Sequence, residues 1–160
     1  MKQGLGTQLA HLLDLLDSAV QEGYTHSGLP MRPRYTPVLR ALIACEPSTI
    51  GQITAAAGIS QPAATQTIAL MVKDGLVSST PGKQDGRQRL IRLTPKGRKL
   101  LPEIQACWEA TKRAADSLDQ DLPFPLAEAL ARALEALKAK PFGQRIAEAR
   151  ETLTQLKDPR

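Results

Sequence analysis

Apolar residues recur at every third or fourth position near the start of the chain, which predicts an amphipathic helix over residues 5–22. The residues that follow, 23–34, are rich in Gly, Ser and Pro and predict a connecting loop. Thr36-Pro37 is typical of a helix start, with threonine as the N-cap and proline at the first helical position. The helix that it opens is expected to end before Pro47.

Two short helical patterns come next, and Gly58 separates them. The first covers residues 50–57, and Ser60 is placed to cap the second, which has Pro62 in its first turn and runs to about Asp74. The second helix has a predicted buried stripe and an opposite, polar face. The stripe consists of Ala64, Ile68, Met71 and Val72. The face consists of Gln61, Pro62, Thr65, Gln66, Ala69 and Lys73.

Residues 77–80 and 89–93 have the pattern of strands, and PGKQDG between them supplies the turn chemistry of a hairpin. Thr94-Pro95 repeats the helix start, and that helix is expected to reach about Leu118. Two further helices are predicted over residues 126–138 and 144–156.

The predicted order is four helices, two strands and three helices. The fold class is therefore mainly α with a small β-hairpin (α+β). A helix-turn-helix followed by a hairpin is a winged helix-turn-helix, and the long helices on either side of it are more apolar than one such module needs.

The composition favours one small domain, because 42% of the 160 residues are hydrophobic but only 3% are aromatic. The formal net charge of +5 suggests a polyanionic partner. Between Pro81 and Lys99 there are seven basic residues against Asp85 alone, so the basic excess belongs to the hairpin and the helix start after it.

Several classes of function are poorly supported. Cys45 and Cys107 form no CxxC motif and have no nearby histidine, so they are expected to be structural, and no metal or cofactor is expected. We find no paired acid and base, no nucleophile beside a histidine and no glycine-rich phosphate loop, so catalysis is not expected. The sequence contains neither a signal pattern nor a long apolar run, and a cytoplasmic protein without a membrane partner is predicted.

A polar-faced helix beside a basic hairpin suits double-stranded DNA, since the helix can enter the major groove while the hairpin follows the phosphates. The alternative is a winged-helix module for protein interaction or for non-specific nucleic-acid binding. A protein-docking module has no need of clustered phosphate-binding charge, and the basic hairpin argues against it.

Three segments, in this order, resemble the MarR family of bacterial transcriptional regulators. They are TPVLRALI at residues 36–43, TIGQITAAAGISQPAATQTIALMVKDGLV at 49–77 and DGRQRLIRLTPKG at 85–97. The resemblance covers roughly the middle two-fifths of the chain. It implies a regulator, expected to be a repressor, that binds a pseudo-palindromic operator as a homodimer. A winged helix-turn-helix over residues 36–98 would then be flanked by dimerisation helices within residues 1–28 and 99–160 of a single domain.

The resemblance also implies a recognition helix over residues 60–74 and a wing over residues 80–89. Asp85 would then hold the wing by pairing with an arginine, although Asp-Gly is also an ordinary turn pair. Many members of the family carry arginine where Gln66 stands, so the wing is expected to supply a larger share of the affinity here. The candidate DNA contacts are Ser60, Gln61, Pro62, Ala63, Thr65, Gln66 and Lys73 on the helix and Lys83, Arg87 and Arg89 on the wing.

A small aromatic effector is a further partner that the family suggests. Each of the aromatic residues and the histidine that would line its pocket is equally suited to the core or to its rim. The candidate pocket residues are Tyr24, His26, Tyr35 and Trp108.

Overall fold

The structure is a computed structural model that describes residues 4–82 and 88–157. It consists of two compact units, Met1–Thr111 and Lys112–Arg160, and the boundary falls within one long helix.

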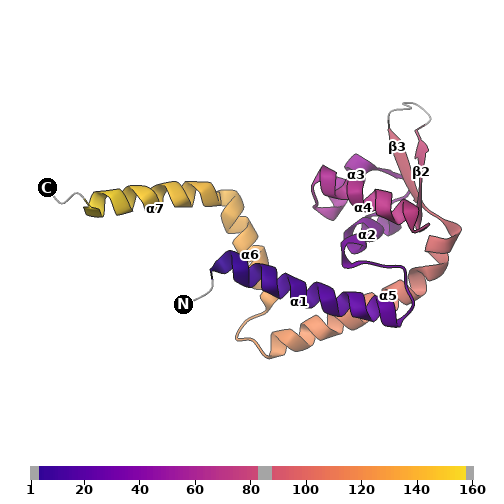
Figure 1. The fold of residues 1–160 in the computed structure, drawn as a ribbon, viewed down its shortest axis with the longest axis horizontal. Coiled ribbons are helices and arrows are strands. Elements are labelled where there is room, and N and C mark those ends of the chain that lie inside the picture. The colour runs from indigo at the N-terminus through magenta and orange to yellow at the C-terminus, as the bar shows by residue number, and fades with distance from the viewer. Residues whose placement is uncertain (1–3, 83–87, 158–160) are drawn as a thin grey trace. The chain divides into compact units, whose positions relative to one another are not determined.

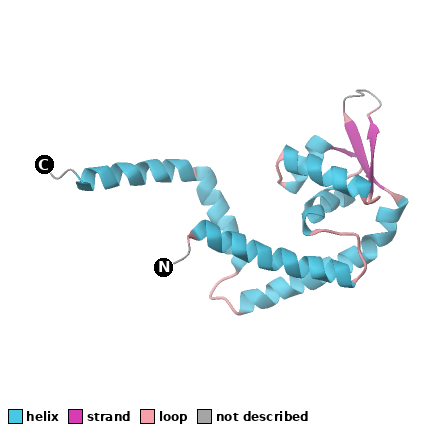
Figure 2. Ribbon diagram, viewed as in Figure 1, coloured by secondary structure: helices cyan, strands magenta, loops and turns pink. Residues whose placement is uncertain are grey.

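The first unit is a helical lobe with a small antiparallel sheet (Figure 1). The sheet has the order β1-β3-β2, and the β2–β3 pairing runs from Val77 opposite Leu93 to Pro81 opposite Arg89. Figure 2 shows β2 and β3 extending beyond the helices of the lobe. The elements are α1 (Leu5–His26), the 3-10 helix η1 (Pro33–Tyr35), α2 (Thr36–Ala44), β1 (Ser48–Thr49), α3 (Ile50–Ala57), α4 (Gln61–Lys73), β2 (Val77–Pro81), β3 (Arg89–Leu93) and α5 (Pro95–Gln120).

The starts of α3 and α4 are fixed by side-chain caps. Thr49 Oγ1 accepts a hydrogen bond from the Gln52 backbone N–H at 3.2 Å, while Gln52 Oε1 accepts from the Thr49 backbone N–H at 2.8 Å. Ser60 Oγ accepts from the Ala63 backbone N–H at 3.4 Å, which confirms the predicted cap of α4. The turn between the two helices passes through Gly58, whose φ of +65° lies in the left-handed region.

The first helix is longer than predicted and ends at His26 rather than near residue 22. Tyr24, which the sequence placed in a loop, is buried, and its hydroxyl lies 3.1 Å from Thr36 Oγ1. Burial of the Tyr24 ring outweighs the weak helix propensity of Gly23. Thr36 is accordingly not the N-cap of α2: it is the first helical residue, and η1 precedes it.

Two further expectations were wrong in detail. The sheet has a third strand, β1, whose two residues are too few to show a periodic pattern. On α4, Val72 is 41% exposed, and Thr67 is buried in its place with Ala64, Ile68 and Met71. The spacing of three, four and seven from Ala64 makes Thr67 part of the inner face.

The wing is attached to α5 through a close backbone contact. Thr94 Oγ1 accepts from the Gly97 backbone N–H at 2.9 Å, which confirms the predicted cap, and it donates to the Gly75 carbonyl at 2.6 Å. A Cβ at position 97 would lie only 2.2 Å from the Leu76 carbonyl oxygen. Only glycine allows α5 to begin at this distance from the end of the loop after α4.

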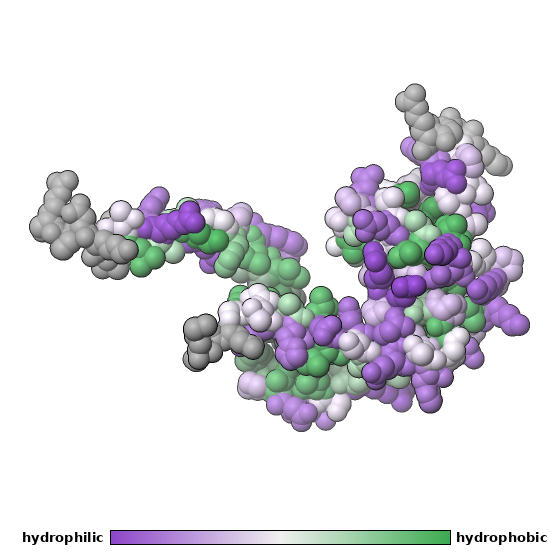
Figure 3. Space-filling view, viewed as in Figure 1, coloured by the Kyte–Doolittle hydropathy of each residue, from purple (hydrophilic) through white to green (hydrophobic). Residues whose placement is uncertain are grey.

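The second unit contains the end of α5 with α6 (Leu126–Ala139) and α7 (Phe142–Lys157). None of the residues 112–154 is buried. Exposed apolar side chains instead recur on one face of each helix, and Figure 3 shows green, hydrophobic residues along both. They are Leu130, Leu134 and Leu137 on α6 and Phe142, Ile146 and Leu153 on α7.

We predict that Gly97→Ala destabilises the fold by about 1–3 kcal/mol, because the new methyl group forces the Leu76 carbonyl to move. Urea denaturation measures this loss. Gly51→Ala is the matched control: it also adds a methyl group to a helix, but its nearest neighbour is Thr49 Oγ1 at 3.9 Å. Equal stability of the two variants would contradict the prediction.

Candidate nucleic-acid interface

The exposed face of α4 is the one that the sequence predicted. Gln61, Pro62, Thr65, Gln66, Ala69 and Lys73 are all exposed, while Ala63 is half-buried. Thr65 Oγ1 donates a hydrogen bond to the Gln61 carbonyl at 2.9 Å. A shallow hollow lies on the first turns of the helix, and its walls are Gln61, Pro62, Thr65 and Gln66.

The wing carries Arg89 in a fixed position. Its Nε donates to Ser79 Oγ at 2.9 Å and its Nη2 to the Ser79 carbonyl at 2.8 Å, so the guanidinium group lies across the neighbouring strand. Lys83, Asp85 and Arg87 lie outside the described residues. Their roles therefore stay predictions from the sequence.

The C-terminal end of α4 is held by a polar cluster. Tyr35 Oη donates to Asp74 Oδ2 at 2.7 Å, Arg32 Nε lies 4.0 Å from the same oxygen, and Lys96 Nζ donates to the Asp74 carbonyl at 2.8 Å. Burial of the phenol, followed by the hydrogen bond to Asp74 and the charge of that residue, raises the pKa of Tyr35 to about 12. Residues of η1 and its N-cap and a lysine of α5 thus all contact Asp74, the residue that caps the C-terminal end of α4.

The four candidate effector residues lie in different surroundings. Tyr24 and Tyr35 are buried and His26 is exposed. Trp108 is half-buried, donates from Nε1 to Tyr24 Oη at 2.9 Å and lies beneath Arg40, whose Cζ is 4.9 Å from the ring centroid. Both tyrosine hydroxyl groups are thus engaged in hydrogen bonds within the lobe.

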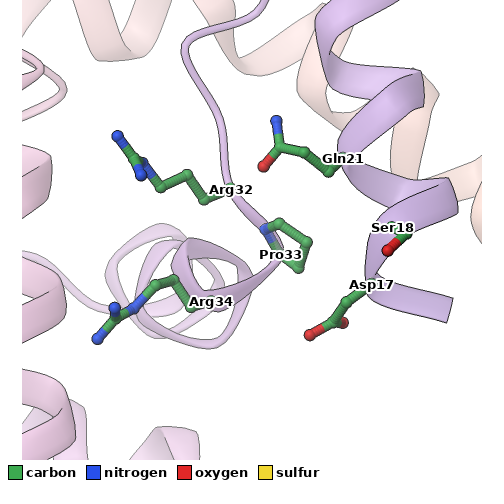
Figure 4. A pocket seen from close by; sticks show the side chains of 6 residues that line it. All are labelled: Asp17, Ser18, Gln21, Arg32, Pro33 and Arg34. Atoms are coloured by element: carbon green, nitrogen blue, oxygen red, sulfur yellow. The ribbon is translucent and has the colours of Figure 1, made fainter. Parts of the chain in front are cut away.

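A hollow lies against α1, but none of the four candidate effector residues lines it (Figure 4). In Figure 4, Asp17 and Gln21 extend from α1 toward the segment that carries the two arginines. Arg34 Nε donates to Thr67 Oγ1 at 3.4 Å, so this segment also touches α4. Two guanidinium groups against one carboxylate favour an anionic ligand. The lining residues are Asp17, Ser18, Gln21, Arg32, Pro33 and Arg34.

The two cysteines that the sequence analysis considered lie in different surroundings. Cys45 is exposed, and Cys107 is half-buried with its Sγ 3.6 Å from Ser27 Oγ. Among residues 4–82 and 88–157, no three or more His, Cys, Asp or Glu side chains are grouped in a way that could hold a metal ion. No helix in the same ranges is long and apolar enough to span a membrane.

Comparison with protein families bears on the interpretation of this surface. A model of the MarR family matches residues 27–88, which run from the end of α1 to the start of β3. This segment of the chain is therefore similar to the MarR family. The match supports a DNA-binding transcriptional regulator, and the fold is a winged helix-turn-helix with α4 as its second helix and the β2–β3 hairpin as its wing.

Solved structures share the fold of this chain at low identity. BpsR of Bordetella bronchiseptica, whose DNA binding is regulated by 6-hydroxynicotinic acid, has 22% identity and a TM-score of 0.63 over 87% of this chain and 94% of its own. The M. tuberculosis regulator MOSR, in complex with DNA, has 20% identity and a TM-score of 0.69 over 88% and 100%. PcaV of Streptomyces coelicolor, with its natural ligand, has 20% identity and a TM-score of 0.57 over 93% and 98%. A comparison of the sequence with curated proteins finds no match.

Sequence reasoning missed two residues that hold the side chains and elements of this surface in place, Asp74 and Ser79. Asp74 was assigned only to the end of the helix, and Ser79 was treated as an ordinary strand residue. Their partners lie 39 and 10 positions away, so no local pattern joins them.

Proposed function

We propose that this transcriptional regulator represses its target by binding an inverted-repeat operator as a homodimer. The observation that carries the proposal is the juxtaposition of the polar, exposed face of α4 with a strongly basic wing. In a symmetric dimer, two recognition helices enter successive major grooves about one helical turn, ~34 Å, apart. Bound there, the protein would exclude the transcription machinery from the same DNA.

The distribution of charge supports a division of labour between helix and wing. Lys73, at the end of α4, is the only basic residue in that helix. The wing and the start of α5 contain most of the remaining basic side chains near this surface. We therefore propose that Lys83, Arg87 and Arg89 contact phosphates, while residues 60–66 lie nearest to the bases, and that Asp85 stabilises the wing.

Homodimerisation is supported by apolar side chains that the single chain leaves exposed. On α1 they are spaced as one stripe, and α6 and α7 carry similar stripes. Because no residue of 112–154 is buried, α6 and α7 gain little stability from packing within one chain. We assign residues 1–28 and 99–160 to the dimerisation region and residues 36–98 to the DNA-binding lobe. The α1 stripe consists of Leu5, Leu9, Leu13 and Leu16, which are 66%, 44%, 59% and 44% exposed.

We propose that a small aromatic acid releases the protein from DNA. The hollow beside α1 supports an anionic ligand through Arg32 and Arg34, and Arg32 also contacts the aromatic ring of Tyr35 at 5.9 Å. Arg32 lies beside Asp74, the C-cap of α4, and Arg34 donates to Thr67 within α4. Occupation of the hollow can therefore change the position of the recognition helix. Of the four candidate pocket residues, Tyr35 contacts Arg32, and the pocket roles of Tyr24, His26, Tyr35 and Trp108 stay predictions.

We further propose a cytoplasmic protein that binds but does not catalyse. Regulation of transcription requires access to chromosomal DNA, and the surface described here offers contacts for a polyanion rather than a reactive centre. No metal or cofactor is needed for the proposed role.

Arg87→Ala is expected to weaken DNA binding by about 1–3 kcal/mol and to lower the salt slope of log K by about one, because one phosphate contact is lost. Fluorescence anisotropy at several salt concentrations measures both. Lys112→Ala removes the same charge from an exposed position on α5 and should change neither value. An unaltered slope for the wing variant would refute phosphate contact at position 87.

Leu134→Asp is expected to convert the dimer into monomers at micromolar concentration, since an apolar contact would be replaced by a buried charge. Leu134 is 61% exposed in the single chain, so the fold of that chain should tolerate the change. Sedimentation velocity measures the association state. Ala139→Asp introduces the same charge at an exposed position of α6 away from the stripe and should leave the dimer intact.

Ser18→Leu should fill the hollow beside α1 and abolish release from DNA by benzoate or 6-hydroxynicotinate without changing DNA affinity. Anisotropy of a labelled operator, titrated with each acid, provides the readout. Ser117→Leu makes the same substitution at an exposed position of α5 and should retain release. If neither acid releases the wild-type protein, the proposed ligand class is wrong.

A further inference from the structure

The reading surface of α4 has an unusual composition for a DNA-binding helix. Its first turns expose Gln61, Pro62, Thr65 and Gln66, which together line a hollow. No arginine occurs between Gln61 and Lys73, and the lysine stands at the last position of the helix. The groups exposed on these turns are therefore two carboxamides and a small, largely apolar surface.

The two glutamine side chains are free to bind. Neither makes a hydrogen bond to another described residue; only the Gln61 backbone carbonyl accepts one, from Thr65. A carboxamide offers one donor and one acceptor side by side. Adenine presents the complementary pair, an N6 donor and an N7 acceptor, in the major groove, whereas guanine presents two acceptors and requires two donors.

Thr65 contributes an apolar group rather than a donor. Its hydroxyl donates to the Gln61 carbonyl at 2.9 Å, so the proton is committed to the helix backbone. What the side chain retains for DNA is its methyl group, and Thr65 lines the same hollow as Pro62. The C5-methyl group of thymine, which lies next to the adenine edge of the same base pair, is the natural partner for such a surface.

We propose that α4 reads A·T base pairs, with Gln61 and Gln66 pairing with adenine and with Pro62 and Thr65 receiving thymine methyl groups. The two glutamines are five positions apart, or about 7.5 Å along the helix axis, so they address different base pairs. The half-site centre is therefore rich in A·T. This inference rests on the proposed operator binding and specifies what that binding recognises.

The first experiment is selection of bound duplexes from a random pool, carried out with the wild-type protein and with Gln66→Arg. The wild type should enrich an inverted repeat with A·T pairs at the centre of each half-site. The arginine variant should shift one position in each half-site from adenine to guanine, by about tenfold or more, because arginine supplies the two donors that guanine requires. Gln105→Ala, an exposed glutamine on α5, should select the same sequences as the wild type.

The second experiment tests single atoms of the selected operator. Replacing the central thymines by deoxyuridine removes only their methyl groups and should weaken wild-type binding about three- to fivefold per contacted methyl. Thr65→Ser should lose this sensitivity, while Thr65→Val, which keeps a methyl group, should retain it. Replacing adenine by 7-deazaadenine removes N7 and should affect the wild type more than Gln66→Ala.

The outcomes separate this inference from the proposed function. An inverted repeat with G·C pairs at the half-site centre, or equal binding of thymine and deoxyuridine operators, would overturn A·T reading while leaving the operator-binding homodimer intact. Enrichment of no sequence at all would overturn both.

Discussion

The position of the recognition helix depends on how its C-terminal end is fixed. There the chain passes through Gly75, whose φ is +73°, and enters β2 directly, while α5 begins against the Leu76 carbonyl through Gly97. Asp74 adds a carboxylate that accepts from Tyr35 and a carbonyl that accepts from Lys96. These contacts join α4, the wing and α5 at one point. A shift of any of these elements is therefore transmitted to the others, and the reading face cannot move independently of the wing.

The same end of α4 is where the hollow beside α1 meets the DNA-binding lobe. Arg32 lines the hollow and lies 4.0 Å from Asp74, and Arg34 lines it and donates to Thr67 on the inner face of the helix. A ligand that attracts these guanidinium groups competes with Asp74 and Thr67 for them. The proposed effector would need such differential contacts to shift the population of DNA-binding conformations, and this pair of arginines would provide them.

Much of the lobe could be predicted because its signals are local. Ser60 and Thr94 cap helices by accepting from residues three positions ahead, Gly58 ends α3 through its own left-handed φ, and the α4 face follows from helical periodicity alone. The errors have physical reasons of another kind. Tyr24 lengthens α1 because it packs on residues 12 and 84 positions away, β1 exists only through its pairing with β3, and Thr67 replaces Val72 where the core has room for it. The hollow beside α1 could not be predicted, since its walls come from two segments with no shared pattern.

The division of labour between helix and wing follows from the different physics of their contacts. Phosphate contacts position a protein on DNA without regard to sequence, whereas base contacts specify it. Here the recognition helix has little charge, and the basic residues are concentrated in the wing and the start of α5. The wing would thus hold the protein on any duplex, while the exposed face of α4, whose one charge is Lys73 at its end, would gain affinity on the right sequence by matching hydrogen bonds and methyl contacts. Discrimination in such a protein comes from the polar groups that a wrong base leaves unpaired, which is why a few exposed amide and methyl groups are sufficient to define an operator.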